Sequence, residues 1–207
     1  MLPCTGVILA GGRATRYAGL PKGLERVGEQ RIIDRVAEVL RASCDDLLLV
    51  ANTPDAAEWL PGVRVVGDLI ADQGSLGGIH AGLVHAGTPV LVVAWDMPFV
   101  PVRLLHQLRA ASDGADAVLP ESGSRRGVEP LCAWYGPECI PAIEQRLAEG
   151  DRRVIGFLDL VRVARVAADE VARHGDPERI FSNVNTPEEL RLAEQHAATA
   201  DDRRPQA

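Results

Sequence analysis

The sequence lacks the features that mark nucleic-acid binding. Its 22 basic residues stand against 29 acidic ones, which gives a formal net charge of −7, and Lys22 is the only lysine. Arginines are adjacent in only three pairs, so the chain contains no basic block. Because affinity for a phosphate backbone comes from clustered Lys and Arg, we expect no nucleic-acid partner.

Long apolar runs and paired cysteines are also missing. No stretch approaches the ~20 apolar residues that span a bilayer, and the first residues lack the charged region of a signal peptide. With 46% hydrophobic and 25% charged residues, the composition indicates a cytosolic globular protein without a membrane partner. Four cysteines without C-x-x-C spacing favour isolated buried thiols over a zinc site or disulfides: Cys4, Cys44, Cys132 and Cys139.

Apolar runs alternate with amphipathic segments along the chain. Strands too apolar to have a wet face predict a mostly parallel sheet that helices cover on both sides, a three-layer α/β sandwich. The domain is expected to span residues 1–198, with 199–207 as a disordered tail. The pattern predicts strands at 6–10, 47–50, 63–66, 90–93, 116–119, 130–134 and 161–166, and helices at 31–43, 78–85, 103–110, 141–149, 153–159 and from 187 onward.

Polar or glycine positions directly follow four of the predicted strands. They are the Gly11-Gly12 loop, Asn52, Asp68 and Asp96. Parallel sheets bind ligands beyond the carboxyl ends of their strands. We therefore expect these positions to line one crevice.

The segment after the first strand has the composition of a phosphate-binding loop. Gly11 and Gly12 would bring bare backbone N–H groups against an anion, and Arg13, Arg16 and Lys22 supply cations that suit a triphosphate. The spacing matches neither G-x-x-x-x-G-K-[ST] nor G-x-G-x-x-G, so it favours neither a Walker A loop nor classical dinucleotide binding. A plain turn with a solvated Arg13 is the structural alternative.

Residues 9–24, with L-A-G-G-x-x-x-R followed by P-K, resemble the opening signature of nucleotidyltransferases with a GT-A-like, Rossmann-related fold. Within that superfamily the sequence resembles the molybdenum cofactor guanylyltransferase (MobA-type) family most. Tyr17, Pro21 and Ser75 depart from the family, which usually has a methionine, an acidic residue and a proline there. Four later segments are similar to family motifs in the same order: 74–83 to G-P-L-A-G, 95–101 to the acidic metal motif C-D-x-P-F, 129–135 to the P-L strand, and 183–189 to N-x-N-T-P-E-E.

The resemblance implies transfer of GMP from GTP to the terminal phosphate of the molybdopterin cofactor, with release of pyrophosphate. Molybdoenzymes and cofactor-carrier proteins are the candidate protein partners. Asn183 and Asn185 would lie near the pterin phosphate, although a structural turn is the alternative for both. The resemblance also assigns catalysis to Lys22, Arg16 and Asp96, Mg²⁺ binding to Asp96, and nucleotide binding to Leu9, Ala10, Gly11, Gly12, Arg13, Lys22, Asn52, Asp68 and Asp96.

The chemistry of these residue types supports such a reaction independently. A phosphate monoester is already anionic at neutral pH, so no general base is required, and catalysis becomes positioning and charge neutralisation. Mg²⁺ takes only one or two protein carboxylates beside phosphate oxygens, which suits Asp96, and a helix cap is the alternative role for that residue. Lys22 is a compact point cation. Use of CTP or another phosphorylated acceptor stays open, as does a non-catalytic nucleotide-binding module, although Lys22 and Asp96 together argue against the latter.

Overall fold

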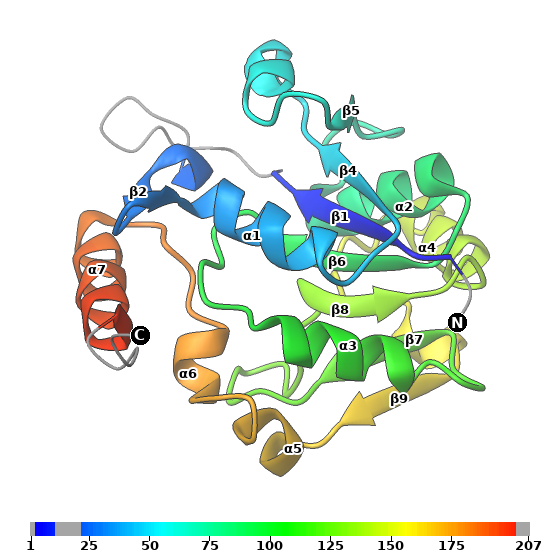
Figure 1. The fold of residues 1–207 in the computed structure, drawn as a ribbon. Coiled ribbons are helices and arrows are strands. Elements are labelled where there is room, and N and C mark those ends of the chain that lie inside the picture. The colour runs from blue at the N-terminus through cyan, green and yellow to red at the C-terminus, as the bar shows by residue number, and fades with distance from the viewer. Residues whose placement is uncertain (1–2, 11–21, 202–207) are drawn as a thin grey trace.

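The structure is a computed structural model, and it describes residues 3–10 and 22–201. Its centre is a seven-stranded sheet with the strand order β5-β4-β1-β6-β8-β7-β9 (Figure 1). Strand β8 alone runs against its neighbours, so the predicted mostly parallel sheet is confirmed. The strands are β1 (Thr5–Leu9), β4 (Asp46–Val50), β5 (Arg64–Val66), β6 (Val90–Ala94), β7 (Ala117–Pro120), β8 (Cys132–Tyr135) and β9 (Val163–Val166).

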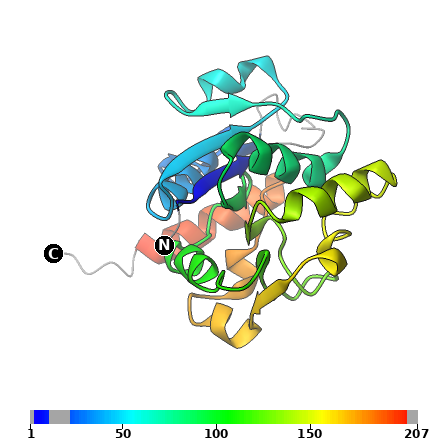
Figure 2. The ribbon, with the colours of Figure 1, turned by 90° about the vertical axis from the view of Figure 1, so that its right-hand side faces the viewer.

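Helices cover both faces of the sheet, which confirms the three layers (Figures 1 and 2). The core is therefore divided in two, and β1 feeds both halves because its side chains alternate: Ile8 packs on the α1 and α3 side, whereas Val7 and Leu9 pack on the α2 and α4 side. The four covering helices are α1 (Ile32–Arg41), α2 (Gly74–Ala86), α3 (Val102–Ala110) and α4 (Cys139–Ala148).

Helix α7 (Pro187–Asp201) brings the end of the chain back to its beginning. It packs against a small hairpin formed by β2 (Arg26–Val27) and β3 (Gln30–Arg31). Val27, Ile32, Val184 and Ala193 form a separate buried cluster there. Shorter elements complete the fold: the 3-10 helices η1 (Lys22–Leu24), η2 (Pro54–Glu58) and η3 (Leu158–Leu160), and the helices α5 (Ala168–Ala172) and α6 (Pro177–Ile180).

The structure corrects the prediction of a helix at 153–159. Val154 and Phe157 are both buried, and their spacing imitates a helical face. The chain instead turns, because Gly156 N donates to the carbonyl of Arg153 at 2.8 Å and Asp151 accepts from Arg153 N at 3.0 Å. Helix α2 also begins four residues before the predicted position, at Gly74 rather than 78. Residues 199–201 of the expected tail belong to α7, and 202–207 lie outside the described residues.

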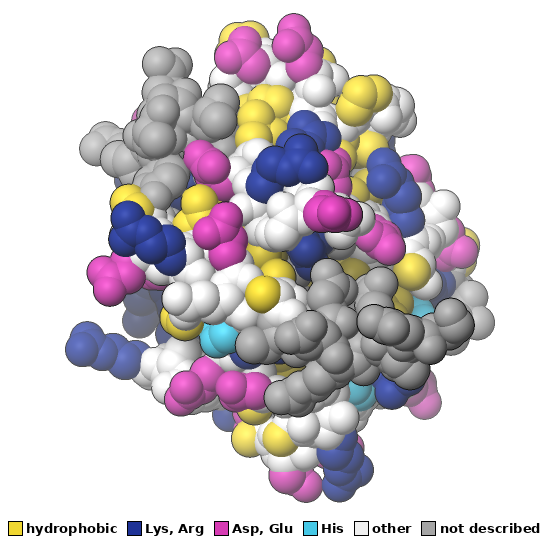
Figure 3. All heavy atoms as spheres, turned by 60° about the vertical axis from the view of Figure 1, so that its left-hand side comes forward, with side chains coloured by type: hydrophobic (Ala, Val, Ile, Leu, Met, Phe, Trp, Pro, Cys, Tyr) yellow, Lys and Arg dark blue, Asp and Glu magenta, His cyan; other side chains and the backbone are white. Residues whose placement is uncertain are grey.

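All four cysteines carry free thiols, but Cys44 is only half-buried and lies beside Cys4, so these two are not the isolated buried thiols that were expected. Burial raises the pKa of Cys139 to about 12 and that of Cys132 further, so these two thiols stay protonated and unreactive. Over the described ranges, no helix is long and apolar enough to cross a membrane. On the face that Figure 3 presents, Lys and Arg side chains are scattered among acidic ones and form no continuous patch.

Candidate active site

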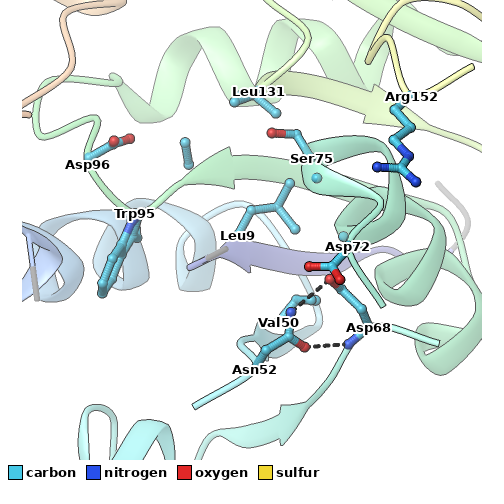
Figure 4. A pocket seen from close by; sticks show the side chains of 13 residues that line it. Leu9, Val50, Asn52, Asp68, Asp72, Ser75, Trp95, Asp96, Leu131 and Arg152 are labelled. Atoms are coloured by element: carbon cyan, nitrogen blue, oxygen red, sulfur yellow. Dashed lines mark hydrogen bonds between the residues drawn. The ribbon is translucent and has the colours of Figure 1, made fainter. Parts of the chain in front are cut away.

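A cleft of about 830 Å³ opens beyond the carboxyl ends of β1, β4 and β6 (Figure 4). Leu9, Val50 and Ala94, the last residues of these strands, form part of its lining. Asn52, Asp68 and Asp96 also line it, so the three strand-end side chains predicted to share one crevice do so. The cleft lies where parallel sheets commonly bind their ligands.

Asn52 and Asp68 hold the ends of β4 and β5 together. Asn52 Nδ2 donates to Asp68 Oδ2 at 2.7 Å, and Asp68 N donates to Asn52 Oδ1 at 2.8 Å (Figure 4). The amide is thereby fixed in orientation, and no hydrogen bond from a described residue occupies the other oxygen of the Asp68 carboxylate. This pair forms an acceptor-rich wall on one side.

Asp96 lies two residues beyond β6 and meets two other predicted residues. Lys22 Nζ is 4.0 Å from Asp96 Oδ2 and donates a hydrogen bond to Asn185 Oδ1 at 2.5 Å. Both charged side chains are largely buried, with exposed fractions of 18% for Lys22 and 14% for Asp96. Burial raises the pKa of Asp96, while the Lys22 charge opposes this rise. Residues from the opening, acidic and closing motifs thus converge on one point.

Backbone contacts hold this convergence in place. Val184 N donates to the carbonyl of Asp96 at 2.9 Å, and Asn185 N donates to the Glu189 carboxylate at 2.6 Å. The closing motif is therefore attached to the acidic motif and to the first turn of α7. Helix α3 begins at Val102 with Pro101 as its cap residue, which excludes the alternative that Asp96 caps this helix.

The remaining predicted residues have different positions. Ala10 is buried, and its N–H donates to the Val50 carbonyl at 2.9 Å. Asn183 is exposed, and its side chain makes no hydrogen bond to the rest of the described chain. Four further predictions lie outside the described residues: Gly11, Gly12, Arg13 and Arg16.

Sequence reasoning missed three charged residues near the cleft. Arg152 and Asp72 line it, and Arg152 reaches toward it from the turn after α4 (Figure 4). Glu129 is buried, its carboxylate accepts from Leu131 N at 3.0 Å, and burial together with the nearby Asp96 charge raises its pKa. Arg152 stands in an adjacent arginine pair, but only the folding of the turn reveals which of the two faces the cleft.

Comparison with known proteins assigns the family. A family model described as the MobA-like NTP transferase domain matches residues 6–171. The chain belongs to this family. The resemblance seen in the motifs is thereby confirmed, and the chain is a nucleotidyltransferase of molybdenum cofactor biosynthesis.

Individual relatives match this MobA-like chain over nearly its full length. A protein of Pelotomaculum thermopropionicum, named "Probable molybdenum cofactor guanylyltransferase", is 42% identical over 92% of this chain and 91% of its own. The molybdenum cofactor guanylyltransferase of Desulfosudis oleivorans is 38% identical over 92% and 94%. The crystal structure of molybdopterin-guanine dinucleotide biosynthesis protein A from Archaeoglobus fulgidus superposes with a TM-score of 0.78, at 27% identity, over 94% and 99% of the two chains.

Proposed function

We propose that this MobA-like protein transfers GMP from GTP to the terminal phosphate of molybdopterin and releases pyrophosphate. The guanylyltransferase names of the two relatives at 42% and 38% identity support the substrates. The single observation that carries the proposal is the meeting of Lys22, Asp96 and Asn185 at the end of a cleft large enough for a nucleotide. Burial of a cation and a carboxylate together contributes little net stability, because both ions lose their hydration, and it therefore supports a functional role for this pair.

Lys22 is the residue that we assign to the α-phosphate and to the charge that develops on pyrophosphate. Its ammonium is a point charge on a flexible stem, so it can follow charge as the bond to the leaving group lengthens. Asn185 accepts one of its hydrogen bonds at 2.5 Å, and no other described residue accepts one, so two donors are open to phosphate oxygens within this part of the chain. The acceptor phosphate is already anionic at neutral pH, so its attack requires no general base.

Asp96 suits a magnesium ion. No group of three or more His, Cys, Asp or Glu side chains that could hold a metal occurs among residues 3–10 and 22–201, so a site with several protein ligands does not fit this part of the chain. One carboxylate at the edge of a phosphate site fits Mg²⁺, which keeps waters and takes phosphate oxygens as its other ligands. When bound, Mg²⁺ would neutralise phosphate charge during transfer. Asp96 would hold it, and Lys22 would share the neutralisation from the other side.

Asn52, Asp68 and Asp72 support guanosine as the nucleoside. The Watson–Crick edge of guanine carries N–H donors, and guanine is therefore favoured by carboxylate acceptors in the wall of the cleft. Cytidine remains the alternative base, because base choice is expected to depend also on the loop at 9–12, of which Gly11 and Gly12 lie outside the described residues.

Pyrophosphate release tests the function directly. The purified protein is incubated with Mg²⁺, molybdopterin and GTP, CTP or UTP in separate reactions, and the dinucleotide product is identified by mass. We expect pyrophosphate release with GTP that depends on molybdopterin. Release with CTP alone would show that the nucleotide substrate carries cytosine instead of guanine. No release with any of the three nucleotides would reject the proposed enzymatic function. Asp96→Ala is expected to abolish turnover, whereas Asp113→Ala, in an exposed turn at the opposite edge of the sheet, should not.

A further inference from the structure

Gly23, the residue after the only lysine, lies flat against the indole ring of Trp95. A Cβ atom at position 23 would stand 2.4 Å from Cε3 of Trp95 and 2.8 Å from Cδ2. The backbone φ of Gly23 is outside the left-handed region that favours glycine. Glycine is therefore required here for space and not for conformation.

Trp95 is in turn held firmly. Its backbone N–H donates to the Leu9 carbonyl at 3.1 Å, and the residue is only 4% exposed. Its ring stacks on Trp59, with centroids 5.1 Å apart and planes inclined by 21°. Aromatic pairs of this kind contribute about 0.5–1.5 kcal/mol beyond the area they bury. The ring is thus a fixed surface attached to the end of β6.

The contact between Gly23 and Trp95 joins the two residues that directly neighbour the charged pair. Lys22 precedes Gly23, and Asp96 follows Trp95. We propose that Trp95 is a positioning residue. Its ring fixes how closely the Lys22–Gly23 backbone approaches the end of β6, so that Nζ of Lys22 reaches both Asp96 and Asn185. The expected effect on turnover rests on the proposed function, whereas the placement of the lysine does not.

A methyl group at position 23 has to move the backbone by about 1 Å to restore an ordinary carbon–carbon separation. Misplacement by that distance can cost about 10²-fold in rate when the group acts on transition-state charge. Gly23→Ala is therefore expected to lower kcat about 10- to 100-fold and to change KM for GTP less than about threefold. Gly123→Ala is the matched control, because position 123 has an ordinary φ and open space around it.

A second substitution distinguishes a shared contact from general damage. Trp95→Val removes the six-membered ring that a methyl at 23 would meet. In that background, Gly23→Ala is expected to cost less than about twofold in kcat, because the steric conflict is gone. Losses that simply multiply in the double variant would overturn the proposal, since the two residues would then act separately.

The single lysine also permits a measurement that needs no turnover. Protein labelled with ¹⁵N at lysine Nζ gives one side-chain resonance, and the hydrogen bond to Asn185 sets its position. Gly23→Ala should shift this resonance toward its position in Asn185→Ala, while in Gly123→Ala the resonance should stay near its wild-type position. An unmoved resonance in folded Gly23→Ala would overturn the proposal, even if Trp95→Val does not fold. An inactive wild type would reject the function and leave this readout decisive.

Discussion

Lys22 donates a hydrogen bond to Asn185, a residue 163 positions later in the sequence, and this bond joins the two ends of the chain at the site. The two residues belong to the first and last motifs of the chain. They meet because α7 packs against the hairpin that follows η1 and because Val184 is tied to the Asp96 backbone. Lys22, which we propose binds phosphate, therefore depends on the C-terminal helix for its position, although no described residue of that helix lines the cleft.

Replacing the lysine by another cation is expected to fail. In Lys22→Arg the charge is kept, but the guanidinium is planar and larger, and it would meet both Asp96 and Asn185 in a space shaped for an ammonium. We expect kcat for GTP to fall on the order of 10²-fold, the usual cost of losing one preorganised donor. Steady-state kinetics of pyrophosphate release measure the loss.

Arg173→Lys provides the control for an exchange of the two cations. Arg173 is exposed and pairs only weakly, at 3.5 Å, with Asp169 on α5. The exchange there should leave kcat and KM unchanged. Normal turnover of Lys22→Arg would show that the solitary lysine is a matter of composition rather than of chemistry.

The sheet and its site edge could be predicted from sequence because each depends on a local signal. Runs such as Leu47-Leu48-Leu49-Val50 predict buried strands directly, and the rule for parallel sheets then places Asn52, Asp68 and Asp96 together. The distances could not be predicted. The approach of Lys22 to Asn185 depends on long-range packing of α7, for which the sequence carries only an N-terminal helix signal.

The two strands that the sequence did not predict are too short to carry a periodic signal. Strands β2 and β3 have two residues each, too few for alternation, and they are defined by the hairpin and by α7 lying over it.

The segment 153–159 has helical spacing at Val154 and Phe157, yet local turn bonds override it. Gly23 belongs to the recognised P-K-G-L segment, but its reason for being glycine appears only when Trp95 is placed against it.

The Asn52–Asp68 pair gives a second prediction. In Asn52→Asp, two carboxylates would face each other where the Asn52 amide now donates to the Asp68 carboxylate at 2.7 Å; the second bond, from the Asp68 backbone N at 2.8 Å, needs only an oxygen at position 52 and is kept. Repulsion should open the wall of the cleft and raise KM for GTP about tenfold, equivalent to about 1.4 kcal/mol, with a smaller change in kcat. Adding Asp68→Asn reverses the donor and acceptor of the side-chain bond and lets it form again, while the backbone bond is unchanged. Failure of this second change to recover any of the KM would argue that the two residues do not act as a pair.

A glycine in helix α2 gives a prediction about the closeness of packing under the cleft. Gly82 faces Val7 of β1, and a Cβ atom there would lie 3.0 Å from Val7 Cγ1. Val7 is fully buried in a central strand and cannot yield. Gly82→Ala should therefore lower the free energy of unfolding, because overpacking of about 1–3 kcal/mol exceeds the ~1 kcal/mol that alanine gains in helix propensity. Urea unfolding measures it. Val84→Ala on the exposed side of the same helix should be neutral or slightly stabilising, and equal effects at both positions would contradict the close packing.

We expect Asp116, which lies away from the cleft, to contribute to the free energy of unfolding in a pH-dependent way. Its carboxylate accepts from Arg162 N at 2.8 Å and from the Arg162 guanidinium, which lowers the pKa of Asp116. A lowered folded-state pKa means that the stabilisation is complete above the unfolded pKa, near 3.9, and is lost as the pH falls through the folded value. Asp116→Asn should therefore cost about 1–3 kcal/mol at pH 7 and progressively less below pH ~4. Urea unfolding at pH 7 and between pH 4 and 3 measures the difference. Activity per folded molecule should stay unchanged, because Asp116 precedes the amino end of β7, away from the carboxyl ends of the strands that form the cleft. A difference in stability that does not shrink in acid would contradict the ion pair as its cause.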